Sequence, residues 1–202
     1  MNYKEMKQVV NLLYNEWNLG KKEAKATGNI CAWIYLMEIL EESEKIVTYK
    51  EDNRVIGICG YSNNKSKKHR IRKSIYKCIK HMLYKNKDIK DLNGLKRYYK
   101  NYDYLPKELQ GYFDGEISIL IVDEKYRGKN IGKKLLYETF ELARKDNINN
   151  LQILTDGACS YKFYEHCGCN KVYETVVVNE EVDKLGNKLT DNAYVYEKKL
   201  NI

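Results

Sequence analysis

Hydrophobic and polar positions divide this chain into segments of two kinds. In some, the apolar residues recur every three or four positions, which is typical of an amphipathic helix; others are short apolar runs bounded by turn residues, which is typical of a strand. The helical segments cover residues 4–17, 30–44, 130–146 and 159–167. The strand segments cover residues 45–50, 54–61, 117–122, 151–155, 171–179 and 191–199. This order predicts an α/β fold with helices flanking a central mixed, twisted β-sheet.

Length and composition fit one domain over residues 1–202. A chain of 202 residues, 43% of them hydrophobic, can bury a complete core. Its apolar runs fall short of the roughly 20 residues that cross a bilayer, and residues 1–5 lack the features of a signal peptide. The six cysteines form no C-x-x-C pair and have no metal-ligand spacing. We therefore expect a cytoplasmic protein with free thiols, no membrane span and no metal.

Residues 62–114 form a basic, tyrosine-rich helical insert. Between Asn64 and Asp91 there are eleven Lys or Arg and two Asp, although the whole chain has a formal net charge of only +8. One helix face collects the apolar residues Ile71, Ile75, Cys78, Ile79, Met82 and Leu83. Such a helix can bind nucleic acid, an anionic membrane or an acidic partner. We expect instead that the apolar face docks on the domain and leaves the lysines in solvent.

A tyrosine cluster follows the basic helix. It comprises Tyr98, Tyr99, Tyr102, Tyr104 and Tyr112. These residues either line a substrate pocket or form the buried underside of the insert, and the sequence alone does not separate the two.

The junction after the strand at 117–122 carries the most specific signal. It reads Tyr-Arg-Gly-Lys-Asn-Ile-Gly-Lys-Lys-Leu-Leu from Tyr126 to Leu136, so a buried strand runs into a glycine-bearing turn that opens a helix. The first amides of a helix have no partner within it, and this end is electropositive, which favours a phosphate or pyrophosphate. The spacing matches neither the dinucleotide fingerprint nor the nucleotide-triphosphate loop.

Two motifs resemble the GNAT superfamily of N-acetyltransferases. Arg127, Asn130 and Gly132 align with its Arg/Gln-x-x-Gly-x-Gly/Ala signature. Residues 158–169 resemble its strand-then-helix motif ending A-x-x-F-Y-x-x-x-G-F, with Ser160 in place of the alanine and Cys169 in place of the final aromatic. Asn130 replaces the first signature glycine; because asparagine tolerates a positive φ, we expect the turn to be kept. Since residues 1–3 are too few for the strand that usually opens this fold, we expect that strand to be missing.

The resemblance implies acetyl-CoA as the acetyl donor and no metal cofactor. Its pantetheine arm would pair with the peptide groups of Leu120, Ile121 and Val122, as an added strand would. Its pyrophosphate would bind at the turn formed by Arg127, Gly128, Lys129, Asn130, Ile131, Gly132 and Lys133.

The resemblance also implies two catalytic side chains. Tyr164 occupies the position of the phenol that protonates the departing thiolate in many family members. Glu116 stands where histone-type members carry a glutamate general base, and desolvation would raise its pKa into a useful range. Alternatively, Tyr164 only packs beneath the sheet, and Glu116 is a solvated turn residue.

The implied function is transfer of an acetyl group from acetyl-CoA to a primary amine of a small molecule or peptide. The acceptor pocket would be built from residues 18–29 and 179–192, and Glu180, Glu181 and Asp183 would favour a cationic amine. Dimers are frequent in this family. The alternative is a catalytically weak CoA-binding scaffold whose segment 64–91 binds nucleic acid or another polyanion.

Overall fold

The structure is a computed structural model that describes residues 1–16, 25–66, 70–86, 104–157, 159–182 and 188–200. Its helices are α1 (Tyr3–Glu16), α2 (Lys25–Glu42), α3 (Arg70–Tyr84), α5 (Ile131–Lys145) and α6 (Lys162–His166), with short 3₁₀ turns η1 (Lys107–Leu109) and η2 (Glu124–Tyr126). Its strands are β1 (Lys45–Glu51), β2 (Arg54–Tyr61), β3 (Gly115–Val122), β4 (Asn150–Asp156), β5 (Asn170–Val182) and β6 (Lys188–Lys199). The predicted order of elements is confirmed, and within the described residues no strand precedes α1.

Local chemistry explains where several elements begin. At the start of α1, Asn2 Oδ1 accepts a hydrogen bond from Glu5 N at 3.0 Å, and Glu5 Oε2 accepts one from Asn2 N at 2.8 Å, which is a reciprocal helix cap. The β1–β2 turn places Asp52 and Asn53 at positive φ of 47° and 62°, as a two-residue hairpin requires.

Two helix boundaries differ from those predicted. Helix α2 begins at Lys25 rather than at residue 30, since its polar first turn carries no apolar period. Helix α6 begins at Lys162 rather than at residue 159. The amide of Cys159 donates to the backbone O and to Oδ1 of Asp156, at 3.2 and 3.0 Å, so the chain turns there before the helix starts.

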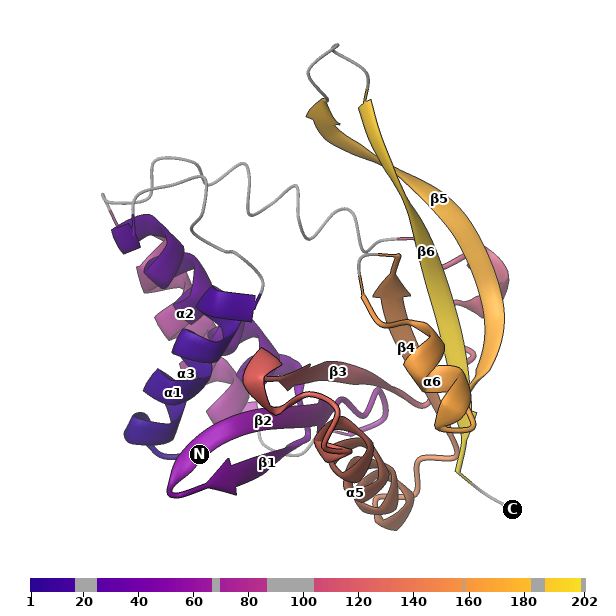
Figure 1. Cartoon of the computed structure of the whole chain (residues 1–202), viewed down its shortest axis with the longest axis horizontal. Coiled ribbons are helices and arrows are strands. Elements are labelled where there is room, and N and C mark those ends of the chain that lie inside the picture. Colours follow the sequence, from indigo (N-terminus) through magenta and orange to yellow (C-terminus); the bar gives the residue numbers. More distant parts are fainter. Residues whose placement is uncertain (17–24, 67–69, 87–103, 158, 183–187, 201–202) are drawn as a thin grey trace.

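The six strands form one mixed sheet in the order β1-β2-β3-β4-β6-β5. Only β3 and β4 are parallel among these neighbours. Helices α1 and α2 cover one face of the β1–β3 half, and α5 covers the other face (Figure 1). The predicted mixed α/β sheet is therefore confirmed.

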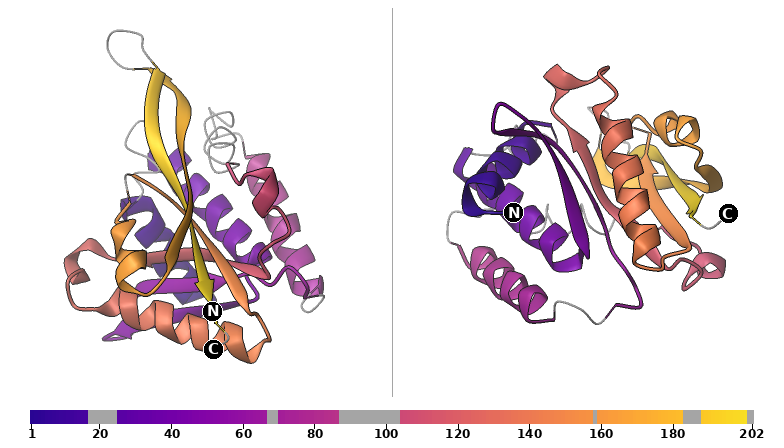
Figure 2. Two further views of the ribbon diagram at one scale, coloured as in Figure 1. Left: turned by 90° about the vertical axis from the view of Figure 1, so that its right-hand side faces the viewer. Right: turned by 90° about the horizontal axis from the view of Figure 1, so that it is seen from below.

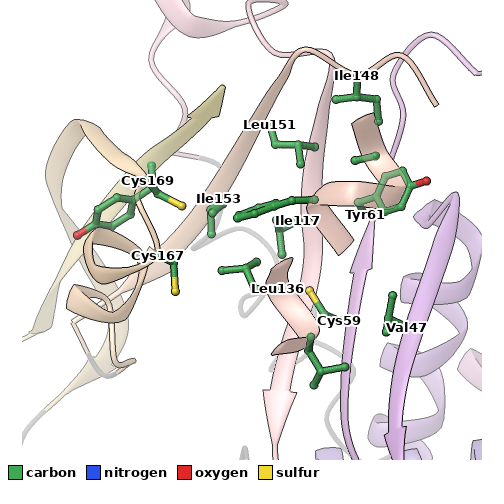
Figure 3. Packing of buried hydrophobic residues seen from close by; sticks show 14 of the residues in the cluster. Val47, Cys59, Tyr61, Ile117, Leu136, Ile148, Leu151, Ile153, Cys167 and Cys169 are labelled. Atoms are coloured by element: carbon green, nitrogen blue, oxygen red, sulfur yellow. The ribbon is translucent and has the colours of Figure 1, made fainter. Parts of the chain in front are cut away.

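A core lies between α5 and the sheet. Leu136 of α5, Cys59 of β2 and Ile117 of β3 are each no more than 6% exposed and point into one cluster with Ile153 and Cys167 (Figure 3). A second core lies on the opposite face, where α1 and α2 meet β2 and β3. The sheet is thus held firmly on both faces where β3 leads into α5.

A β-bulge in β3 changes which residues face which core. Tyr61 of β2 pairs with Ile117, and the preceding residue, Gly60, pairs with Ile119, so Ser118 is the extra residue. Ile117 packs on the α5 side, whereas Ile119 and Ile121 pack against α1 and α2. Leu120 and Val122 therefore return to the α5 side, next to the turn that follows β3.

The predicted insert helix exists as α3, but the prediction for its apolar face is wrong. Ile71, Ile75, Ile79 and Met82 are 80%, 53%, 38% and 71% exposed, and Cys78 is exposed as well. Of the predicted apolar face, Leu83 packs inward, together with Tyr76, which was not part of it. The helix docks instead through polar contacts, because Arg72 Nη2 donates to Ser43 O and Glu44 O at 2.9 and 3.2 Å, and Lys80 pairs with Glu41 at 2.7 Å.

Candidate active site

Strands β3 and β4 open into a fork. They pair only at Gly115 with Leu151 and at Glu116 with Gln152, and beyond this point β3 pairs with β2 while β4 pairs with β6 (Figure 1). The edge of β3 that carries the peptide groups of residues 120–122 therefore faces the open side of the fork. An unpaired strand edge can accept an extended ligand through backbone hydrogen bonds.

The turn between β3 and α5 presents the start of a helix beside this fork. Lys134 N donates the first hydrogen bond of the α5 ladder to Asn130 O at 3.0 Å, so the amides of Ile131, Gly132 and Lys133 precede the ladder. Asn130 has a φ of 59° and its side chain makes no capping hydrogen bond, so it leaves these amides uncovered. Gly128 has a φ of 78°, which only glycine adopts readily. The positive φ predicted for Asn130 is confirmed.

Charged side chains surround the turn, and several are already held by the protein. Arg127 Nε donates to Val122 O at 3.3 Å, and its guanidinium pairs with Glu16 of α1. Lys129 lies over the ring of Tyr126 at 4.9 Å, and Lys133 lies over that of Tyr137 at 5.7 Å. Arg127 therefore braces the turn, while the two lysines contribute positive charge at its surface.

Helix α6 brings Tyr164 to the same region. Phe163 precedes Tyr164 on α6, and a methyl group added at Gly132 would lie 3.6 Å from the Phe163 ring. Helix α6 and the start of α5 are therefore in contact. The Tyr164 ring packs edge-on against Phe163 and tilted against Tyr196 of β6, with centroids 5.5 and 5.7 Å away. Burial, with a smaller contribution from the nearby thiols of Cys59 and Cys159, raises the pKa of Tyr164. The phenol therefore stays protonated at neutral pH.

Glu116 stands at the vertex of the fork, in a row of polar side chains. Gln152 Nε2 donates to Glu116 Oε2 at 2.7 Å, and Glu197 of β6 lies next to Gln152 in the sheet. Burial raises the pKa of Glu116, and the hydrogen bond from Gln152 partly opposes that rise. Gln152 and Glu197 are only 9% and 6% exposed. Glu116 is therefore a carboxyl group held in a partly desolvated setting and not a solvated turn residue.

Residues near the end of the insert and on α2 lie beside the same polar side chains. Tyr104 Oη donates to Thr155 O at 3.0 Å, near the end of β4, and Tyr112 Oη donates to Glu197 Oε1 at 2.9 Å. The surrounding protein, with the negative charges of Glu38 and Glu116, raises the pKa of Glu42 to about 7. Of the tyrosine cluster, Tyr104 and Tyr112 therefore lie against the sheet beside the fork. Tyr98, Tyr99 and Tyr102 lie outside the described residues.

The sequence reasoning missed Gln152, Glu197 and Glu42. A signal for Gln152 was present, since it is the only polar residue in the otherwise apolar run from Leu151 to Leu154. Glu197 and Glu42 become neighbours of the fork only through strand pairing and helix packing. The predicted acceptor residues Glu180, Glu181 and Asp183 lie outside the residues whose side chains are described, as does most of the segment 18–29.

The cysteines, possible metal ligands, helix lengths and one surface depression are the other features that bear on a functional site. All six cysteines are free thiols, as predicted. In the described ranges no group of three or more His, Cys, Asp or Glu side chains is placed to hold a metal ion. None of the described helices is long and apolar enough to span a membrane. A depression of about 700 Å³ between α1 and the β1–β2 turn is lined by Gln8, Arg54 and Asp123 among others and includes no residue of the fork.

Comparison with known proteins agrees with this geometry. The sequence profile described as the acetyltransferase (GNAT) family matches residues 7–169. None of the curated proteins matches the chain.

Solved structures of the same fold cover nearly the whole chain. An N-acetyltransferase from Staphylococcus aureus Mu50 has 16% identity and a TM-score of 0.57, over 100% of this chain and 96% of its own. Arylalkylamine N-acetyltransferase 2 from Aedes aegypti has 17% identity and a TM-score of 0.57, over 100% and 97%. A protein assigned to the GNAT family from Desulfovibrio desulfuricans has 13% identity and a TM-score of 0.56, over 99% and 95%. With the strand fork, the helix-start turn and the family profile in agreement, this chain belongs to the GNAT family of acetyltransferases.

Proposed function

We propose that the protein transfers an acetyl group from acetyl-CoA to a primary amine of a small molecule or peptide. One observation carries this proposal: the open edge of β3 leads to the uncovered amides at the start of α5, and α6, the helix that carries Tyr164, contacts the same start of α5. Family membership supports the same chemistry, since GNAT acetyltransferases use acetyl-CoA.

The residues of the fork fit the proposed donor. The amides of residues 131–133 precede the α5 hydrogen-bond ladder and suit a pyrophosphate, with Lys129 and Lys133 beside them. The free edge of Leu120, Ile121 and Val122 suits the amide-bearing pantetheine arm, which would pair there as a further strand.

Two side chains serve as the general base and the general acid of the proposed reaction. The reaction forms a C–N bond to the acetyl carbon and breaks the thioester C–S bond, so the amine loses a proton and the sulfur gains one. Glu116, whose pKa is raised by burial, takes the proton from the amine, and Tyr164, which stays protonated, donates one to the sulfur.

The acceptor side of the fork favours a cationic amine. Glu116 and Glu42 border it, and both have raised pKa values, Glu116 because it is buried and Glu42 because of partial burial and the negative charges of Glu38 and Glu116. An amine that binds as an ammonium ion offsets this crowded negative charge; it releases one proton to solvent to become the neutral nucleophile, and Glu116 takes the second proton during attack on the thioester. This substrate class agrees with the amine acceptor named for the Aedes aegypti protein of the same fold.

Release of the CoA thiol in the presence of a panel of amines tests the proposal. We expect amine-dependent release by the native protein and a loss of about 100-fold or more in kcat for Tyr164→Phe, which removes the proton donor. Tyr137→Phe on the exposed face of α5 is the matched control and should retain activity. A Tyr164→Phe variant as active as the native protein would remove Tyr164 from the mechanism, and the absence of release with every amine would contradict the proposed function.

The pH profile separates the role of Glu116 from that of Tyr164. Since the base must be ionised, kcat/KM should fall as the pH drops through the raised pKa of Glu116. Glu116→Gln should lower kcat/KM and abolish this acid limb, whereas Glu138→Gln, an exposed carboxylate on α5, should leave it unchanged. An unaltered acid limb in Glu116→Gln would show that another group, or water, takes the proton.

A further inference from the structure

Helix α3 exposes a continuous apolar stripe. Ile71, Ile75, Cys78, Ile79 and Met82 are spaced four, seven, eight and eleven residues from the first, so they share one face of the helix. Three of the large side chains in this stripe are more than half exposed, at 80% for Ile71, 53% for Ile75 and 71% for Met82. Apolar surface of this kind, gathered on one helix, marks an interaction site.

Positive charge accompanies the stripe. Lys77, His81 and Lys85 are all exposed and spaced by four residues, so they form a slanted row that runs from the far side of the helix at Lys77 to the edge of the stripe at Lys85. The sequence around the helix adds to this charge, since residues 64–91 contain eleven Lys or Arg against two Asp and no Glu. An apolar stripe bordered by cations is typical of a helix that lies in the interface of an anionic bilayer.

The position of α3 leaves this face accessible. The helix contacts the rest of the protein through Arg72, Tyr76, Lys80 and Leu83, which lie on its other side. Figure 2 shows α3 at the periphery of the molecule, on the opposite side from α6. A flat surface can therefore meet the stripe without covering α6.

We propose that the exposed face of α3, formed by Ile71, Ile75, Ile79 and Met82 with Lys77 and Lys85, binds the surface of an anionic lipid membrane. The helix would lie parallel to the bilayer, with the stripe entering the boundary between headgroups and acyl chains and the lysines at the phosphates. Its 15 residues span about 22 Å, enough for one interfacial helix and too short to cross the bilayer.

Two other occupants fit less well. A second copy of the same face would bring two strongly basic helices together, and like charges repel. Nucleic acid would use the lysines but would leave the isoleucines and the methionine in water, because polyanion binding rests on phosphate contacts. Of these three occupants, the membrane is the one that uses both the apolar stripe and the charge.

Co-sedimentation of the full chain with vesicles tests the proposal. We expect binding to vesicles of phosphatidylcholine and phosphatidylglycerol, little binding to phosphatidylcholine alone, and weakening as salt is added. The variant Ile71→Ser/Ile75→Ser/Met82→Ser should bind anionic vesicles at least about tenfold more weakly, because the apolar contribution is lost. Lys77→Ser/Lys85→Ser should bind less and lose part of its salt dependence.

A matched control uses apolar residues exposed elsewhere. Val176 and Val178 of β5 are 58% and 53% exposed, and Val176→Ser/Val178→Ser should bind vesicles as the native protein does. Failure of the native protein to bind anionic vesicles would overturn the proposal. So would unchanged binding by the stripe variant, a dimer in vesicle-free buffer that this variant dissociates, or a large drop in its urea midpoint, which would show that the chain itself covers the stripe.

Discussion

Helices α5 and α3 are each 15 residues long and both carry a basic, amphipathic sequence, yet they place their apolar faces in opposite surroundings. Leu135, Leu136 and Phe140 of α5 are 4% exposed or less and pack on the sheet, whereas the corresponding stripe of α3 faces solvent. Amphipathic spacing therefore predicts that a helix forms. It does not predict whether the protein itself covers the apolar face.

The two helices also differ in what holds them. Helix α5 follows β3 in the chain after a short turn, so its apolar face packs on the sheet that contains β3. Helix α3 lies in the insert between the neighbouring strands β2 and β3 and is held by hydrogen bonds and ion pairs to the end of α2. Helix α5 is therefore part of the core that positions the fork, whereas α3 is attached to the outside of that core.

Truncating one residue in the apolar face of each helix should give the largest difference. Leu136→Ala on α5 should lower the free energy of unfolding by about 2–5 kcal/mol, because it leaves a cavity in a core where Leu136 is 0% exposed. Ile75→Ala on α3 should change it by less than about 0.5 kcal/mol. Urea unfolding measures both values, and similar losses for the two variants would break the comparison.

Removing the polar attachment of α3 should have an intermediate effect. Arg72→Met loses two hydrogen bonds, to Ser43 O and Glu44 O, and should cost about 1–3 kcal/mol in unfolding free energy. Lys77→Met, at an exposed position of the same helix, is the control and should be nearly neutral. If Arg72→Met also proves neutral, α3 is not held by these contacts.

The smallest expected effect is a pH dependence carried by Glu42, the last residue of α2. The pKa of Glu42 rises from 4.5 to about 7 in the folded protein, so the folded state binds more protons than the unfolded state between these values. This group therefore makes stability fall as the pH rises through that window, and Glu42→Gln should flatten the fall. Urea midpoints across the window measure it; Glu138→Gln on α5 should change nothing, and an equal slope in native protein and Glu42→Gln would contradict the assignment.

Local features of the sequence were enough to predict the turn between β3 and α5. Strand β3, the turn with its left-handed Asn130 and the start of α5 are contiguous, so the apolar run and the glycines predict them together. The β1–β2 hairpin is equally local, and Gly168, with a φ of 72°, follows the end of α6.

Features that depend on distant segments were not predictable. The bulge at Ser118 arises from pairing with β2, where Ser118 Oγ lies 2.7 Å from Ser43 Oγ at the end of α2. The contact of Glu116 with Gln152 needs the parallel start of β4, 36 positions along the chain. The prediction for α3 was wrong because a periodicity argument assigns the apolar face to the core, whereas Arg72 and Lys80 form the docking contacts.

The central claim is that acetyl-CoA binds in the fork with its pyrophosphate at the start of α5. Isothermal titration of acetyl-CoA tests it most directly when the native protein is compared with Gly132→Glu and Ser74→Glu. A carboxylate at position 132 suits a helix start, so the fold should persist, but it places negative charge where the pyrophosphate would bind. Ser74→Glu adds the same charge on exposed α3. We predict micromolar binding by the native protein and by Ser74→Glu, and none by Gly132→Glu; equal binding by all three, or no binding by the native protein, would contradict the account.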